Sequence, residues 1–594
     1  MRLTPQGVFM QYGESLHILD YIVILAYFII IVFIGIFFSK FIKQAKDYFA
    51  AGAAVPWWLA GISLWMASFS ALTFVVYSQL AFKYGFLAIT LSWTVAPAMI
   101  LAYLFFSSRW RRTRVMTPLG FMEQRYNGLV HQIFVWTGIP LRLIDNSIKI
   151  YSTAVFLAVA VGQSWFSLEI CIFLVGMIMI FYTLLGGQWA VLVTDFVQFI
   201  ILCLAVLILF PLSLHAVGGV SGLVAKSPEG FFRLLNPPYG AFDWVMFCIM
   251  ICISYNATWG LVQKYNCVAT EKDARKVALT MGILATVGPI IFFIPAMAAR
   301  VLLPELSEMA DGSKFAYVAI SLKLLPAGIM GLMVAGMFSA TLSTLGSDYN
   351  VLSGVLTKDF YGKIIRPGAD EKQLILWGRI NTAIIGSITV LIAIGINYVS
   401  GFNLYDIMVK AFGALGPAIM LPLLGGLFFR NINSRGAMTG VLAGMFSGIG
   451  LVVLNFILLG IYSERILVDE SLNYWLKQGY NSVTIGFNII VTVLGMWIGS
   501  AVFSAPDEEK ERVKEFFSHM DVPTEPKVDP QDDSKQSPFG AVGIALILLG
   551  VILLITGIIM YFSGDMRAMG LDMLAGGIMC VIGLIFRLKI SGRN

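Results

Sequence analysis

A stripe of small and hydroxyl-bearing residues interrupts the apolar stretch between residues 331 and 350. Its members are three or four positions apart and would share one face of a helix: Ala340, Ser343, Thr344 and Ser347. Hydroxyl oxygens are hard, neutral ligands that can replace water around a hard cation without adding negative charge. By itself the stripe fits a packing face that lets two backbones approach closely, and it predicts a cation site only together with the rest of the chain.

Ionisable side chains also occur inside the apolar stretch at residues 129–161, where the sequence places Arg142, Asp145 and Lys149. Asp145 and Lys149 are four residues apart, so on a helix they can neutralise one another. Ionisable groups deep in a membrane are costly, and they usually face a partner or a cavity. Two interpretations stay open, a structural ion pair and a group that faces a substrate.

A further carboxylate, Asp195, follows Gly186 and Gly187, which we expect to break the chain at a membrane face. Asp195 and Gln198 would then lie one or two turns inside the next span, on one side of the helix. A carboxylate at that depth favours a cation as partner. The alternative is an acid near a helix N-terminus, stabilised by the macrodipole.

Two apolar stretches are interrupted by polar residues, the first near Ser68 and Ser70 and the second between Ser254 and Gly260. Hydroxyl groups there can bond backbone that has lost its helical partner. In the first stretch this would expose the carbonyls of residues such as Met66 and Phe69 to a cation, whereas a continuous helix with packed serines is the alternative. Two interrupted spans, about five spans apart, are typical of inverted-repeat transporters.

The elements that must position these groups are membrane helices. Hydrophobic residues make up 58% of the 594 residues and charged residues 12%, against roughly 25% charged in soluble domains. Apolar runs of about 20 residues, each long enough to cross a bilayer, recur along the chain. We therefore predict an all-α polytopic membrane protein with about fifteen spans. The expected spans are 18–38, 56–81, 86–107, 129–161, 167–186, 190–213, 241–262, 276–302, 326–350, 374–398, 404–429, 435–460, 478–502, 539–561 and 569–588.

Lysine and arginine residues concentrate in alternate loops, and Lys264 is counted among them. Such loops stay in the cytoplasm, which places the N-terminus outside and the C-terminus inside. Residues 1–505 would form the transport core with an extra N-terminal helix. Residues 506–538 would form an exposed, charged cytoplasmic linker that begins with a short helix, and residues 539–594 would add two C-terminal membrane helices.

The same sequence argues against other classes of protein. The six cysteines show no metal-binding spacing and fall mostly in apolar spans, and no nucleophile–histidine–acid set can be assembled within the membrane. A solute-sensing receptor would be expected to carry a long signalling domain, which the sequence does not contain. We expect neither enzymatic activity nor a nucleic-acid partner.

Several motifs together resemble the sodium:solute symporter family. They occur in the expected order over roughly residues 18–505: Asp47-Tyr-Phe49 with Pro56-Trp-Trp58, Tyr182-Thr183 through Gly186-Gly187 to Thr194-Asp195 and Gln198, Ser343-Thr344, Gly413 to Pro417, and Gly436 to Gly440. The resemblance implies a leucine-transporter-type core of two inverted five-helix repeats, here spans two to six and seven to eleven.

The resemblance also implies sodium ligands. The principal site would use two carbonyls of the first broken helix and three groups on the stripe: Met66, Phe69, Ala340, Ser343 and Thr344. Some members have a second sodium site, and Asp195, Ser343 and Ser347 match its pattern. One serine expected there is Gly346 in this chain, so the pattern of the second site is incomplete.

The solute site departs from the sugar-binding pattern of the family. At positions that contact solute in relatives the chain has Ser68, Leu72, Thr73, Ser92, Tyr255, Thr258, Ala285 and Val409, so a galactose-like binding mode is not expected. Where sialic-acid-transporting members have a carboxylate-binding arginine, the chain has Asp145, with Lys149 one turn on. Either Lys149 binds a carboxylate, or Asp145 binds an amine or several hydroxyls of the solute.

Together these residues predict sodium-coupled import of a small polar organic solute by alternating access, with a sugar or a sugar acid such as sialic acid favoured. An amino acid or another small carboxylate is the alternative solute. The expected location is the plasma membrane, a bacterial inner membrane, with the lipid bilayer, sodium and the solute as partners.

Overall fold

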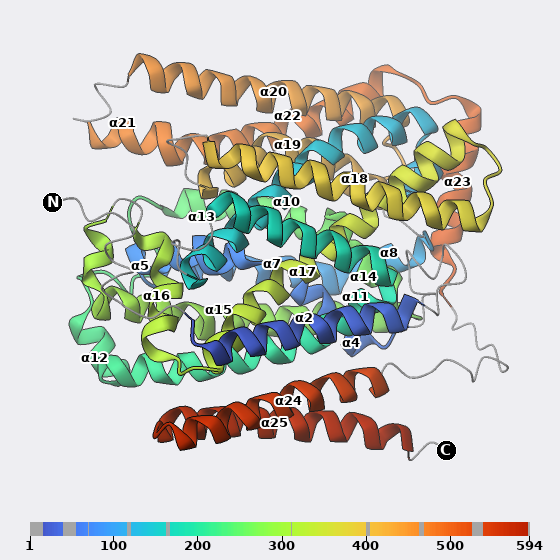
Figure 1. The fold of residues 1–594 in the computed structure, drawn as a ribbon. Coiled ribbons are helices and arrows are strands. Elements are labelled where there is room, and N and C mark those ends of the chain that lie inside the picture. Colours follow the sequence, from blue (N-terminus) through green and yellow to red (C-terminus); the bar gives the residue numbers. More distant parts are fainter. Residues whose placement is uncertain are drawn as a thin grey trace.

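The computed structural model describes residues 16–39, 55–68, 70–115, 120–161, 167–309, 312–398, 404–462, 469–524 and 539–591. Within these ranges every regular element is a helix (Figure 1). Twelve helical stretches of the described chain are long and apolar enough to cross a membrane, and one bent pair of helices would make thirteen. The polytopic all-α class is therefore confirmed, with fewer full-length spans than the fifteen predicted.

Three of the expected spans, 56–81, 167–186 and 241–262, are not single full-length helices. The span expected at 56–81 is divided into α4 (Trp57–Met66), a π-helical turn (Thr73–Tyr77) and α5 (Ser78–Tyr84). The spans expected at 167–186 and 190–213 join in one helical run, α11 (Leu168–Val217), whose first apolar part is a short segment, Leu168–Leu184. The two glycines before Asp195 do not end this run, because a glycine inside a helix costs only about 1 kcal/mol relative to alanine.

The first broken helix is held by side-chain hydroxyls. The Ser68 hydroxyl donates to the Trp65 carbonyl at 2.6 Å, just beyond the end of α4. The Ala71 amide donates to the Thr341 hydroxyl at 3.0 Å, and Thr341 belongs to α17 (Ile329–Val355). Backbone groups freed by the break are thus satisfied by hydroxyls, as the sequence predicted, and one of these comes from the helix that carries the stripe.

The second broken helix consists of α13 (Ala241–Ala257) and α14 (Trp259–Asn266), which meet at an angle of 49°. Thr258 between them has an extended backbone conformation, so the helical hydrogen-bond ladder stops there. Gly260 allows α14 to approach α17 closely, because a Cβ atom at this position would lie 2.8 Å from Oδ1 of Asp348. The polar interruption predicted at 254–260 is therefore a bend packed against the stripe helix.

Helix α17 lies at the centre of the molecule, and all of its residues are buried. Helices α2 (Ile18–Ser39), α10 (Gly128–Val161) and α11 pack against it, and Figure 1 shows α17 among them. The hydroxyl stripe predicted from the sequence is therefore buried inside the bundle, where Thr344 and Ser347 line a cavity. This is the placement that a binding site inside the membrane requires.

Outer helices complete the bundle. Helices α24 and α25 form a closely packed pair beside α2 (Figure 1). Their backbones approach at Gly543, where an added Cβ atom would lie 2.7 Å from the Gly583 carbonyl oxygen. The remaining long helices and this pair have these bounds: α15 (Glu271–Leu302), α18 (Glu371–Tyr398), α19 (Leu404–Phe428), α20 (Ser434–Ile461), α22 (Tyr480–Val502), α24 (Phe539–Phe562) and α25 (Met566–Ser591).

The described part of the expected linker is less exposed than the sequence predicted. It contains α23 (Asp507–Asp521), which packs against α8 (Ser107–Arg112) and α9 (Gly120–Arg125). One face of α23 is buried through Phe516, Phe517 and Met520. Charge dominates the composition of this segment, but three apolar side chains at helical spacing provide a docking face.

Candidate sodium and solute sites

Three of the predicted sodium ligands lie together. The Thr344 hydroxyl lies 3.0 Å from the Ala340 carbonyl oxygen and 3.5 Å from the carbonyl oxygen of Met66, the last residue of α4. Phe69, the other predicted carbonyl ligand, lies outside the described residues. The stripe on α17 thus faces the end of the first broken helix.

Ser343 supplies the observation that best fits a bound cation. Its side chain is fully buried, and its Oγ atom makes no hydrogen bond of normal length within the described ranges, although it lies close to the Asp195 carboxylate. A buried polar atom left without a partner costs about 1–3 kcal/mol. A sodium ion between Ser343, Thr344 and the neighbouring carbonyls would satisfy this oxygen, so the residues present fit the ion.

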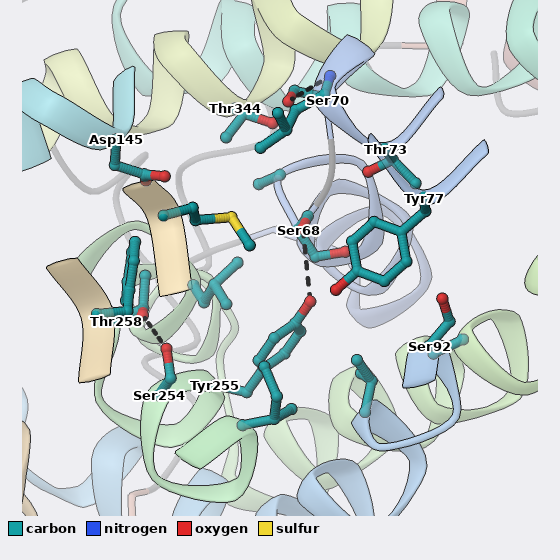
Figure 2. A pocket seen from close by; sticks show the side chains of 18 of the residues that line it. Ser68, Ser70, Thr73, Tyr77, Ser92, Asp145, Ser254, Tyr255, Thr258 and Thr344 are labelled. Carbon is teal, nitrogen blue, oxygen red and sulfur yellow. Dashed lines mark hydrogen bonds between the residues drawn. The ribbon is translucent and has the colours of Figure 1, made fainter. Parts of the chain in front are cut away.

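A cavity of about 220 Å³ lies between the two broken helices (Figure 2). Thr344 of the stripe also lines it, which brings the solute and sodium sites side by side. All seven residues predicted to bind solute line this cavity: Ser68, Thr73, Ser92, Asp145, Lys149, Tyr255 and Thr258. Whether they bind solute stays a prediction.

Two of the hydrogen bonds at the cavity are long. The Tyr255 hydroxyl on α13 donates to the Ser68 carbonyl at 3.5 Å, which links the two broken helices (Figure 2). The hydroxyls of Ser254 and Thr258 also lie 3.5 Å apart. Hydrogen bonds of this length are weak, so a solute hydroxyl can replace them at little cost.

Four charged side chains from two helices form what we call the charged tetrad: Arg142, Asp145, Lys149 and Asp348. The Lys149 ammonium lies 2.8 Å from Asp145 and 3.3 Å from Asp348. The Arg142 guanidinium lies 3.6 Å from Asp145 and donates to the Thr258 hydroxyl at 3.1 Å. Two positive and two negative groups balance, so the tetrad carries no formal net charge.

The tetrad combines the two interpretations that the sequence left open for Asp145 and Lys149. These residues form an ion pair, and they also line the cavity. Because Lys149 contacts two carboxylates, it is not an unpaired cation available to a solute carboxylate. Arg142 is the member that reaches the second broken helix, through Thr258.

Asp195 lies in a second charged site, away from the cavity lining. Its carboxylate is fully buried and accepts a hydrogen bond from Ser63. The ammonium of Lys264 lies 3.7 Å from it, and that side chain is also fully buried. Ser347, which with Ser343 was also predicted for a second sodium, lines the cavity and is buried with a hydroxyl that has no partner in the described part of the chain.

The position of Lys264 corrects the sequence analysis, which counted this residue among the cytoplasmic loops. Helix α14 continues to Asn266, beyond the span end expected at residue 262, and directs the lysine inward. No helical period in the sequence could reveal this contact, because it depends on the bend at Thr258. Asp348, by contrast, follows Thr344 by one helical turn and could have been added to the stripe.

Known proteins and one family model are similar to this chain in sequence. The family model described as "Sodium:solute symporter family" matches residues 48–444. The chain is 26% identical to sodium/glucose cotransporter 2 of Rattus norvegicus, covering 74% of this chain and 72% of the relative. It is 24% identical to the sodium/sialic acid symporter NanT of Aliivibrio fischeri, covering 77% and 92%. It is 25% identical to sodium/myo-inositol cotransporter 2 of Homo sapiens, covering 90% and 83%.

Solved structures share the fold. A sodium-coupled sialic acid symporter, in a substrate-bound outward-open state, aligns with a TM-score of 0.67 and 20% identity over 82% of this chain and 98% of that one. Mhp1, a nucleobase-cation-symport-1 family transporter in a closed conformation, aligns with a TM-score of 0.50 and 13% identity over 79% and 98%. At identities of 20% and 13%, these similarities show only that the fold is shared.

Proposed function

Because the chain belongs to the sodium:solute symporter family, a family of membrane transporters rather than enzymes, we propose that it imports a small polar organic solute together with sodium. A sugar or a sugar acid is the favoured solute. The observation that carries the proposal is the unpartnered Ser343 hydroxyl, buried beside Thr344 and two carbonyls at the edge of a polar cavity.

Sodium would be held by the Met66, Phe69 and Ala340 carbonyls and the hydroxyls of Ser343 and Thr344. Met66 and Phe69 come from the first broken helix and the other three from α17, so the ion would link the two elements. A conformation in which the first broken helix and α17 are apart would lose some of the sodium ligands. Sodium thereby favours one state of the transporter, and the energetic coupling to solute follows because Thr344 also lines the cavity.

The cavity favours a polyhydroxylated solute. Hydroxyl-bearing side chains surround it, and the aromatic rings of Tyr77, Tyr255 and Phe412 also line it. Aromatic faces and hydroxyls together suit a sugar, which has an apolar ring face and a polar edge. The balanced tetrad lets the cavity accept such a neutral solute without leaving an excess charge buried.

An amino acid is the second candidate, and a separate observation favours it. The tetrad presents charges of both signs to one cavity, with Asp145 and Asp348 available to an amine and Arg142 to a carboxylate. A zwitterion could exchange with these internal contacts. A singly charged sugar acid would instead depend on Arg142 alone.

The architecture proposed with this function is a leucine-transporter-type core of two inverted five-helix repeats. The first repeat would begin at the broken helix containing α4, and the second at the α13–α14 pair. The extra helices would be α2, α24 and α25 together with others outside the core. We also propose a bacterial inner-membrane location, with the N-terminus outside and the C-terminus in the cytoplasm, from the alternation of basic loops.

Thermal stability of the purified protein tests the proposal. It should be measured against sugars, sialic acids and amino acids in sodium chloride and in choline chloride. A shift that needs both the solute and sodium supports symport and identifies the solute class. A solute shift of equal size in choline would contradict sodium coupling.

A further inference from the structure

The Asp195 site differs from what a second sodium would require. Asp195 lies on α11 and is fully buried, and its carboxylate contacts Ser63 of α4 and Lys264 of α14. Ser63 of α4 donates its hydroxyl hydrogen to the carboxylate, so that hydroxyl is already engaged. Lys264 of α14 is the charged group within ion-pair distance of Asp195 in the described part of the chain.

The Lys264 ammonium is itself poorly satisfied by other groups. It is fully buried and has no hydrogen-bond partner in the described ranges, so the 3.7 Å contact with Asp195 is its electrostatic support. A buried ammonium without a nearby carboxylate is strongly unfavourable. Asp195 and Lys264 therefore depend on one another.

We propose that Lys264 is a tethered cation that takes the place of a second sodium ion at Asp195. The carboxylate and the ammonium neutralise each other in a site where both side chains are fully buried. Adding sodium would leave a net positive charge in this buried space, which burial disfavours. Charge balance therefore disfavours a second sodium, although Asp195 and Ser347 resemble its ligands in sequence and the Ser347 hydroxyl and the Asp195 Oδ1 atom are buried without a hydrogen-bond partner in the described ranges.

One sodium per transport cycle follows from this assignment. The link between α11 and α14 is made by a covalently attached cation, so it does not depend on the sodium concentration. Sodium dependence would then come from the principal site on α17 alone. This inference rests on the proposed function, because it presumes that the principal site binds sodium.

Counting bound ions tests the inference without knowledge of the solute. Equilibrium binding of radioactive sodium to the purified full-length protein should give one ion per wild-type molecule. Lys264→Met, which removes the charge but keeps the length of the side chain, should bind one ion more than wild type. Lys264→Arg keeps the charge and should bind the same number as wild type.

Three controls locate the additional ion. Thr344→Ala should remove the principal ion, whereas Lys264→Met combined with Thr344→Ala should retain one. The double variant Asp195→Asn with Lys264→Met has no charge at the second site and should bind one ion. If Lys264→Met alone fails to fold, the ion count of this double variant can still be compared with that of wild type. Lys410→Met removes another membrane lysine, which lies beside Asn455, and should leave the count unchanged.

The outcomes separate this inference from the proposed function. Two ions on the wild-type protein, or no additional ion on a folded Lys264→Met variant, would overturn the role of Lys264 and leave sodium coupling intact. No ion on the wild-type protein would overturn the proposed function. In that case a single ion gained by Lys264→Met would still support the replacement of sodium by lysine at Asp195.

Discussion

The Asp195–Lys264 pair and the charged tetrad are both buried and electrically balanced, yet they differ in what surrounds them. The pair has two charged members, both fully buried, at 3.7 Å. The tetrad has four members that line a cavity, with contacts of 2.8 to 3.6 Å. Asp145 and Lys149 each contact two oppositely charged members of the tetrad, so either can lose one contact and keep the other, whereas the pair has no substitute for either member.

This difference separates a fixed structural charge from a set of charges that can exchange partners. A solute that enters the cavity can replace one contact of the tetrad, because Lys149 is shared between two carboxylates. Nothing in the described surroundings of Asp195 offers a similar exchange. We therefore expect mutations of the pair to act first on stability, and mutations of the tetrad to act first on solute affinity.

The largest effect is expected at the pair. Asp195→Asn leaves a buried ammonium without its carboxylate, which should lower the free energy of unfolding by about 3–5 kcal/mol. The measurement is thermal unfolding of the purified protein in choline, where no sodium contributes. Asp195→Asn combined with Lys264→Met removes both charges and should restore most of the stability.

If the double variant does not regain stability, the contrast between the pair and the tetrad is wrong. That result would mean that Asp195 is held mainly by other contacts, such as the hydrogen bond from Ser63. Ser63→Ala provides the matched control, because it removes that contact and keeps both charges. We expect it to cost about 1.5–3 kcal/mol, the usual range for a hydrogen bond to a charged group.

Asp145→Asn should act on solute binding more than on stability. Lys149 keeps its contact with Asp348 in this variant, so the loss of unfolding free energy should be about 1–2 kcal/mol, below that at the pair. Solute affinity should fall about tenfold or more, equivalent to about 1.4 kcal/mol. Solute-dependent thermal shifts at fixed sodium measure it. A greater loss of sodium affinity than of solute affinity would instead make Asp145 a structural ion-pair member.

Sequence reasoning succeeded where chemistry followed helical spacing. The stripe through Ser343 and Thr344 needed only a period of three to four residues and one long helix. The contacts of Asp145 with Lys149 were foreseen for the same reason, since both lie on one helix four residues apart. The broken helices were predictable from hydroxyls placed within apolar runs.

Contacts between helices were less accessible to sequence reasoning. Lys264 was assigned to a loop because lysines near helix ends usually mark the cytoplasmic side. Its real environment depends on the 49° bend between α13 and α14 and on the close approach at Gly260. The environment of such a residue depends on how its helix packs against two others. A local sequence pattern contains no information about that packing.

Ser343→Ala tests whether the principal sodium site is independent of the pair. The sodium concentration for half-maximal stabilisation should rise about tenfold, as expected for a loss of about 1.4 kcal/mol of binding free energy. Stability in choline should change little, because the variant removes a buried hydroxyl that makes no hydrogen bond of normal length in the described ranges.

Ser339→Ala is the matched control for Ser343→Ala, one helical turn earlier. Its hydroxyl bonds the Tyr27 hydroxyl at 2.9 Å and the Ala335 carbonyl at 2.7 Å. We expect this variant to lose stability without a change in sodium affinity. An unchanged sodium requirement in Ser343→Ala would rule out its role as a ligand.

The smallest effect is expected for Tyr255→Phe in the lining of the cavity. The bond from Tyr255 to the Ser68 carbonyl is 3.5 Å long, so its loss should change unfolding free energy by only about 0.5 kcal/mol. If the Tyr255 hydroxyl bonds the solute in the bound state, the variant should also bind solute more weakly. The loss of solute affinity should then be several-fold greater than the change in unfolding free energy would account for. Tyr317→Phe is the control, because its hydroxyl is buried without a partner in the described chain and does not line the cavity. Equal effects of the two variants on solute affinity would place Tyr255 with the fixed packing of the pair rather than with the exchangeable contacts of the tetrad.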